Sequence, residues 1–76
     1  MITIKYFGLI AEVTSQTEET IDFSGRFISE LLDTLYFKYP DLKNKDFQVA
    51  QNQELVSKST EIIGQELALL PPFSGG

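Results

Sequence analysis

Residues 28–40 read ISELLDTLYFKYP, and this stretch decides the fold. Its apolar side chains recur at spacings of three and four residues, which places them on one stripe of an α-helix. The members of this stripe are Ile28, Leu31, Leu32, Leu35 and Tyr39. Ser24 is the predicted N-cap, and Pro40 ends the helix because a proline pushes the preceding residue out of helical geometry.

Strands are predicted on both sides of this helix. Residues 2–7 alternate, with Ile2, Ile4 and Tyr6 on one face, so one face of this strand should be buried. Phe7 falls on the polar face, where it either caps the core or offers an exposed apolar contact for a partner. The other predicted strands are residues 19–23, 47–51, 55–56 and 66–70.

The connections between these elements are less regular. Residues 9–13 should form a short turn of helix or a packed loop, and residues 41–46 a polar, solvated link. Asn52 favours a tight turn because asparagine tolerates a positive φ. From the irregular segment 57–65, Ile62 and Ile63 are expected to pack into the core.

The order strand, strand, helix, strand, short strand, strand is typical of an α+β fold in which one helix covers one face of a sheet. Since the first and last strands are joined through the helix, they can lie side by side in parallel at the sheet centre. The predicted domain covers residues 1–70, and residues 71–76 form a predicted flexible tail.

The composition removes many kinds of chemistry. The 76 residues contain no cysteine and no histidine, which excludes disulfides, Cys–His and Ser-His-Asp catalysis and an ordinary zinc site. We expect no bound metal or cofactor.

The net charge of −5 argues against nucleic acid and anionic membrane as partners. It favours solubility and permits steering towards a basic protein cleft. The absence of a long apolar segment predicts a cytoplasmic protein.

The last six residues, Pro71-Pro72-Phe73-Ser74-Gly75-Gly76, form the most unusual part of the sequence. Two prolines stiffen an arm that cannot continue a strand. The two glycines leave the final carboxylate on the least hindered backbone available. Such an arm reaches roughly 19 Å at the polyproline rise per residue, which suits entry into another protein's active site. The alternative is an ordinary frayed terminus.

Several motifs together resemble the small, sulfur-carrying subunit of molybdopterin synthase, within a ubiquitin-like sulfur-carrier family. The motifs are Tyr6-Phe7-Gly8, Glu30-Leu31-Leu32-x-x-Leu35, Asn52-Gln53-x-Leu55-Val56, Gly64-x-Glu66-Leu67-Ala68 and Leu69-Leu70-Pro71-Pro72-x-Ser74-Gly75-Gly76. The resemblance implies a ubiquitin-like β-grasp fold, with a mixed sheet of four to five strands and one main helix packed on one face.

The resemblance also implies a mechanism. A ubiquitin-activating-like adenylyltransferase uses ATP to adenylate the Gly76 carboxylate, and sulfur then replaces AMP to give a thiocarboxylate. Phe73, Ser74 and Gly75 thread into the large catalytic subunit of the synthase, where the sulfur is donated to a pterin precursor. The chain itself would be a carrier with no catalytic side chains, bound to neither nucleic acid nor membrane.

Some positions depart from the family pattern. Phe27 occupies the place where a serine or threonine often begins the helix, and leucines precede Pro71 where aromatics are frequent. Phe73 replaces a smaller aliphatic residue. These changes concern docking rather than the tail chemistry. For docking we predict Phe7, Leu70 and Phe73, since interface anchors are often aromatic and apolar.

Three other functions remain open from the sequence. The first is a sulfur carrier for thiamin thiazole synthesis, which tends to lack the two prolines before its glycines. The second is a ubiquitin-like modifier joined through Gly76 to lysines of target proteins. The third is an interaction domain whose tail has no chemistry. Fold alone does not separate these functions.

Overall fold

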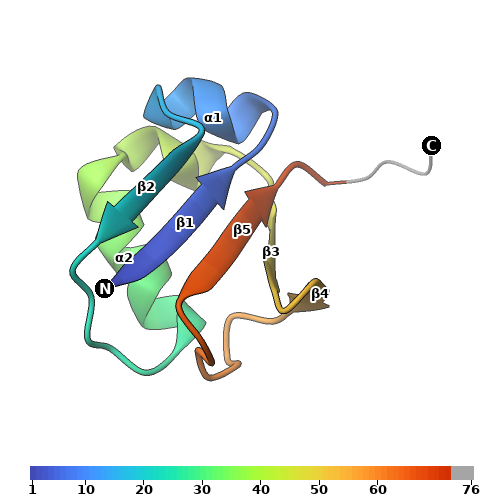
Figure 1. Cartoon of the computed structure of the whole chain (residues 1–76). Helices are drawn as coiled ribbons and strands as arrows, with labels where there is room; N and C mark the ends of the chain where they lie inside the picture. The colour runs from blue at the N-terminus through green and yellow to red at the C-terminus, as the bar shows by residue number, and fades with distance from the viewer. Residues whose placement is uncertain (73–76) are drawn as a thin grey trace.

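The computed structural model describes residues 1–72 and arranges them in two layers, a five-stranded mixed sheet and one main helix (Figure 1). The elements in chain order are β1 Ile2–Tyr6, α1 Leu9–Thr14, β2 Glu18–Ile21, α2 Ile28–Lys38, the 3₁₀ helix η1 Pro40–Asn44, β3 Gln48–Gln51, β4 Glu54–Val56 and β5 Glu66–Leu70. The predicted α+β, ubiquitin-like β-grasp fold is confirmed.

The last strand of the chain lies inside the sheet. The strand order is β2-β1-β5-β3-β4, with β5 parallel to β1 and antiparallel to β3. Leu67 lies opposite Ile4, and Leu69 lies opposite Tyr6 on one side and Val49 on the other. The predicted parallel pairing of the first and last strands is therefore correct.

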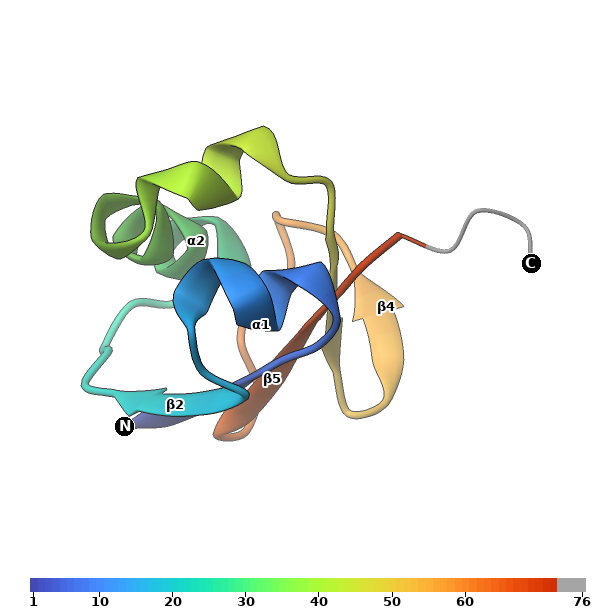
Figure 2. The same ribbon diagram turned by 90° about the horizontal axis from the view of Figure 1, so that it is seen from above.

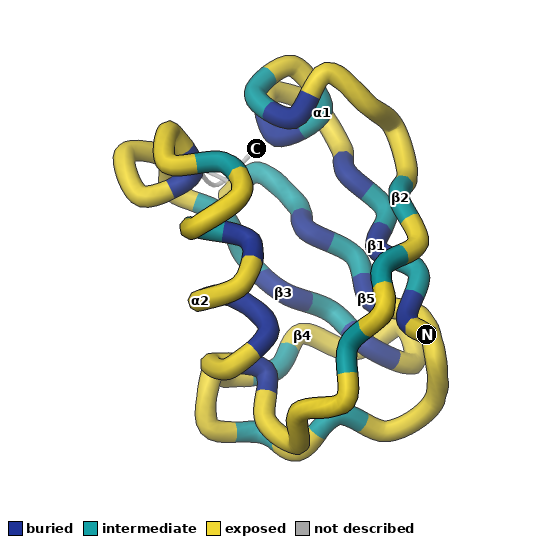
Figure 3. The backbone as a smooth tube through the Cα atoms, turned by 90° about the vertical axis from the view of Figure 1, so that its left-hand side faces the viewer, coloured by how far each residue is buried: buried dark blue, intermediate teal, exposed yellow. Residues whose placement is uncertain are grey.

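One face of the sheet packs against α2 to form the core. Buried positions alternate with partly exposed ones along β1 and β5 (Figure 3). The buried apolar residues are Ile2, Ile4, Tyr6, Ile10, Ile28, Leu31, Leu32, Leu35, Leu42, Val49, Leu67 and Leu69. The helical stripe predicted from the sequence supplies four of them, and its fifth member, Tyr39, is partly buried against the same core.

The start of α2 differs from the prediction. Phe27, not Ser24, is the N-cap, and no side chain caps the helix from that position. Instead the Glu30 carboxylate accepts hydrogen bonds from the backbone N–H groups of Arg26 and Phe27, each at 2.8 Å. The free N–H groups of Ile28 and Ser29 donate to carbonyls of the 57–65 segment, at 3.0 and 2.9 Å. The prediction of Ser24 as the N-cap was wrong, because carbonyl groups of a distant segment accept hydrogen bonds from the free N–H groups at the start of the helix.

Two further expectations need correction. The 41–46 link is not wholly solvated, because η1 turns Leu42 into the core, where it is fully buried. Ile62 packs against the core, but Ile63 is 54% exposed and does not. The 9–13 stretch forms the short helix α1. The tight turn at Asn52 is present, and Gln53 also has a positive φ, as a two-residue hairpin of type I′ requires.

Among the helices of residues 1–72, none combines the length and the apolar character that a membrane crossing needs.

The two faces of α2 provide a direct test of the core. Leu35 is fully buried, whereas Phe37, two residues later, is 91% exposed. Leu35→Ala should lower the free energy of unfolding by about 2–5 kcal/mol, because it leaves a cavity among packed side chains. Phe37→Ala is the control and should change it by no more than about 0.5 kcal/mol. Urea denaturation followed by circular dichroism measures both; equal effects would contradict the assigned packing.

Candidate functional site

The chain leaves the sheet at the end of β5, between β1 and β3 (Figures 1 and 2). The parallel pairing continues one residue beyond β1, because the Phe7 N–H donates to the Leu69 carbonyl at 3.1 Å. On the other side, Leu70 lies opposite Gln48 of β3. The backbone is therefore held from both sides up to the residue that precedes Pro71.

Gly8 packs directly against Pro71 at this exit. Its φ is +59°, and a Cβ atom built on it would lie 2.7 Å from the Pro71 Cγ atom. Both the backbone conformation and the space require glycine. The Tyr6-Phe7-Gly8 motif thus ends β1 and makes room for the proline that follows β5.

An apolar surface lies on the sheet face opposite α2. We call it the outer apolar face; its members are Phe7, Ala50, Leu55, Ala68 and Leu70. Ala50 lies opposite both Ala68 and Leu55 in the sheet register, and the alternation along each strand directs these positions away from the core. Phe7 is 44% exposed and Leu55 is 56% exposed.

The structure brings two of the three predicted docking residues together. Phe7 and Leu70 both belong to the outer apolar face, Phe7 exposed and Leu70 partly buried. The third, Phe73, lies outside the described residues, as do Ser74, Gly75 and Gly76 of the predicted tail. Leu55 and the two alanines were not predicted, because their common face depends on the pairing of three strands.

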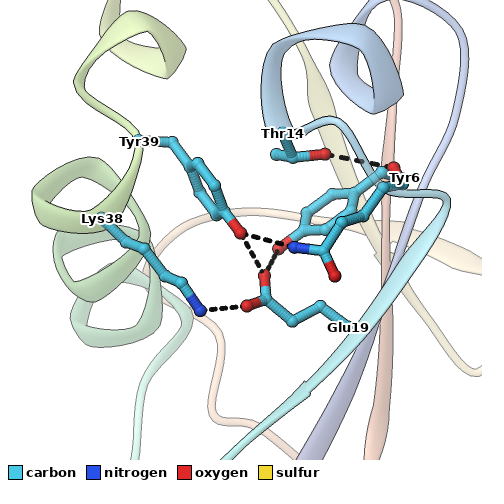
Figure 4. Close-up of polar contacts among 6 residues, drawn as sticks. Tyr6, Thr14, Glu19, Lys38 and Tyr39 are labelled. Atoms are coloured by element: carbon cyan, nitrogen blue, oxygen red, sulfur yellow. Dashed lines mark hydrogen bonds and ion pairs between the residues drawn. The ribbon is translucent and has the colours of Figure 1, made fainter.

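A second group of polar side chains surrounds Glu19 (Figure 4). The hydroxyls of Tyr6 and Tyr39 both donate to its Oε1 atom at 2.8 Å, and the Lys38 ammonium pairs with Oε2. The Gln16 amide donates to the Tyr39 hydroxyl at 2.7 Å. This Glu19 cluster joins β1, β2 and the end of α2. Sequence reasoning missed it because its members are far apart along the chain.

The pKa shifts in the Glu19 cluster oppose acid–base catalysis. Burial works to raise the pKa of Glu19, but hydrogen bonds from Lys38, Tyr39 and Tyr6 outweigh burial and hold this pKa below its ordinary value. Burial and the hydrogen bond to Glu19 raise the pKa of Tyr6 well above its ordinary value. Catalytic acids and bases need pKa values near the working pH. The cluster therefore suits a structural role in fastening β2.

Within residues 1–72, no three acidic side chains come together in an arrangement that could hold a metal ion.

Comparison with known proteins gives a family and several structural neighbours. The model of the ThiS family matches residues 4–76. The crystal structure of SAMP1 from Haloferax volcanii is 29% identical, with 99% of this chain and 98% of that chain covered and a TM-score of 0.78. A crystal structure of small archaeal modifier protein 1 from H. volcanii is 26% identical, covering 95% and 97%, with a TM-score of 0.80.

A third neighbour shares the fold at lower identity. It is a putative molybdopterin converting factor, subunit 1, from Pyrococcus furiosus, 21% identical with a TM-score of 0.84. The alignment covers 95% of this chain and 97% of that one. This agreement over nearly the full length of both chains supports the β-grasp fold.

The Glu19 cluster predicts a specific pH dependence. Because the folded-state pKa of Glu19 is depressed, its contribution is present above the usual glutamate pKa of about 4.3 and is lost as pH falls through the folded value. Glu19→Gln should therefore destabilise the protein by about 1–3 kcal/mol at pH 7. The difference from wild type should shrink steadily between about pH 5 and pH 2.

Thermal melts of both proteins across this pH range measure the difference. Glu30, whose pKa is also lowered by the backbone N–H groups of Phe27 and Arg26, contributes equally to both and cancels. Glu12→Gln, on the exposed surface of α1, is the control and should melt like wild type. A Glu19→Gln deficit that stays constant down to pH 2 would show that packing, not charge, stabilises the cluster.

Proposed function

The chain belongs to the ThiS family, and on this premise we propose that it is a sulfur carrier that acts through the carboxylate of Gly76. The observation that carries the proposal is the family match over residues 4–76, which spans both the β-grasp domain and the Gly-Gly sequence. The exit of the chain beside the outer apolar face supports it, because a partner docked on Phe7 and Leu70 would lie next to Pro71, where the chain leaves the sheet.

The proposed chemistry has two steps, the first at the α-phosphorus of ATP and the second at the Gly76 carbonyl carbon. A carboxylate oxygen of Gly76 attacks the α-phosphate of ATP, and pyrophosphate leaves to give an acyl adenylate. Hydrosulfide supplied by the loading system then attacks the acyl carbon, AMP leaves, and loss of the sulfur-bound proton gives the thiocarboxylate. Adenylation is needed because an ionised carboxylate is a poor electrophile. The adenylyltransferase supplies the acid, base and metal for these steps, so the carrier needs no such side chains.

The thiocarboxylate is then the sulfur donor in a second protein. Docking of the folded domain raises the local concentration of this sulfur at the acceptor's active site and fixes its approach. We propose the large catalytic subunit of molybdopterin synthase as the acceptor, and a pterin precursor as the substrate. The name of the P. furiosus neighbour, subunit 1 of a putative molybdopterin converting factor, and the Pro-Pro-x-x-Gly-Gly sequence favour this pathway over thiazole synthesis.

A second candidate is a protein modifier. The neighbour at 29% identity is SAMP1, and the related H. volcanii structure is named a small archaeal modifier protein. A modifier would use the same acyl adenylate, but the acyl group would pass to a lysine amine of a target and form an isopeptide bond. The two candidates share activation and differ in the group that accepts the acyl carbon or its sulfur.

Intact-mass spectrometry distinguishes the candidates. Protein taken from cells that contain the activating system should gain about 16 Da at Gly76, because one oxygen is replaced by sulfur. Covalent adducts with other proteins would instead favour the modifier. A variant with one alanine added after Gly76 is the control, and it should fold normally and remain unmodified. Full sulfur loading of that extended variant would contradict a reaction at the Gly76 carboxylate.

The docking role of Phe7 gives a second test. Phe7→Ala should weaken binding to the large synthase subunit by at least about tenfold, as expected for an aromatic anchor. Its melting temperature should change little, because the ring is 44% exposed. Isothermal titration calorimetry measures the affinity, with Phe37→Ala on the opposite layer as the matched aromatic control. A large fall in melting temperature with unchanged affinity would place Phe7 in the core instead.

A further inference from the structure

The basic residues of this acidic chain fall into two groups. Three of the six are paired: Lys5 with Glu66 at 3.5 Å, Arg26 with Glu61 at 3.5 Å, and Lys38 with Glu19. The other three are Lys43, Lys45 and Lys58. Within residues 1–72, none of these three lies within ion-pair distance of a carboxylate. Their lack of carboxylate partners is notable because acidic residues outnumber basic ones by 11 to 6.

The three unpaired lysines line a single groove of about 580 Å³. We call it the lysine groove; η1 and the residues that follow it form one side, and β3 and β4 the other. Its apolar lining consists of Tyr36, Phe47, Val49 and Val56, together with Leu55 at the sheet edge, which the groove shares with the outer apolar face. The rings of Tyr36 and Phe47 meet edge to face at 6.4 Å, and the Lys43 ammonium lies 6.0 Å from the Tyr36 ring. Asp46 is the one acidic residue in the lining.

The lysine groove borders an edge of the sheet. In the described chain β4 pairs with β3 alone, so its other edge presents backbone N–H and C=O groups without a strand partner. An edge of this kind pairs readily with an extended peptide. Leu55, in the middle of β4, is 56% exposed. The groove therefore offers backbone pairing, apolar contact and positive charge at one place.

We propose that the lysine groove binds an extended acidic segment of a partner protein. Carboxylates of the segment would face Lys43, Lys45 and Lys58, an aliphatic side chain would lie against Tyr36 and Phe47, and the backbone would pair with β4. A small anion would satisfy the lysines but would use neither the apolar lining nor the strand edge. A nucleic acid could contact the three lysines through its phosphates, but it has no peptide backbone to pair with the free edge of β4.

The groove lies close to the chain exit, so binding there would contribute to the proposed function by orienting the partner. Gln48 lines the groove and lies opposite Leu70 in the sheet. β4 and the end of β5 lie on the same side of the molecule (Figures 1 and 2). A segment in the groove would therefore orient the partner next to the chain exit. Clustered positive charge on an otherwise negative surface would steer that orientation.

An NMR titration with a defined probe tests the proposal without any loading of Gly76. The probe is an acetylated decapeptide in which valine alternates with glutamate and aspartate. We expect chemical-shift changes at the three lysines and along β4, slower amide exchange in β4, and affinity at least about threefold weaker at 0.3 M than at 0.05 M salt. Shift changes confined to the outer apolar face, or no binding, would overturn the proposal.

Two double variants separate a local site from general charge. Lys43→Gln/Lys58→Gln removes two groove lysines and should weaken binding at least about fivefold, a change typical of lost charge pairs. Lys5→Gln/Arg26→Gln removes the same charge from exposed ion pairs, which contribute little to stability, and should retain wild-type affinity. Melting temperatures and dispersed spectra verify that both fold.

Three outcomes of this comparison would overturn the proposal. Equal loss of affinity in the two double variants would show a general charge effect. Displacement of the peptide by equimolar inorganic phosphate would show a small-anion site. Binding without slower amide exchange in β4 would remove the strand pairing. Because the unloaded protein is used throughout, none of these results depends on the proposed reaction at Gly76.

Discussion

The insertion of β5 between β1 and β3 is the constraint on which the rest of the structure depends. A parallel neighbour for β1 requires a long crossover connection, and here the intervening chain supplies α2, η1 and the β3–β4 hairpin. As a result the last strand in sequence is held on both sides by hydrogen bonds. The chain therefore leaves the sheet from its central strand, which is paired on both sides.

The same strand serves two opposite surfaces. Leu67 and Leu69 point to α2 and are fully buried, whereas Ala68 and Leu70 belong to the outer apolar face. Since side chains alternate with a period of two, a slip of one residue in register would exchange these sets. The core thus fixes the register, and the register fixes which side chains accompany the exit of the chain. The stability of the domain and the composition of the outer apolar face are therefore set by one pairing.

The parts of the fold that follow from local periodicity could be predicted from the sequence. The α2 stripe and the alternation of β1 are of this kind, and the parallel pairing of β1 with β5 could be inferred from the crossover connection through the helix. Ser24 could not be excluded as N-cap, because the carbonyls that satisfy Ile28 and Ser29 come from a segment about thirty residues later. Leu42 was missed because a single apolar residue in a polar link carries no periodicity.

The positions of the lysines show more clearly what local sequence cannot predict. Lys38, Lys43 and Lys45 form one basic cluster in the sequence, and the sequence favours a solvated surface for them. The structure divides this cluster: Lys38 turns to Glu19, while the other two join Lys58 across the groove. Charged residues that are close in the sequence therefore need not be close in the structure, because the direction of each side chain depends on the elements that pack beside it.

If the chain acts as the proposed carrier, its lack of histidine and cysteine leaves selectivity to the surfaces that partners recognise. Adenylation precedes both sulfur donation and protein modification, so either function requires an enzyme that recognises this domain before it reacts with the tail. The outer apolar face and the lysine groove border the end of β5, one by apolar contact and the other by charge. Two weak contacts on one rigid sheet orient a partner more strictly than either alone, because the second forms at high effective concentration. The selectivity of the reaction would then reside in the folded domain, and the reactive carboxylate would need no distinguishing chemistry of its own.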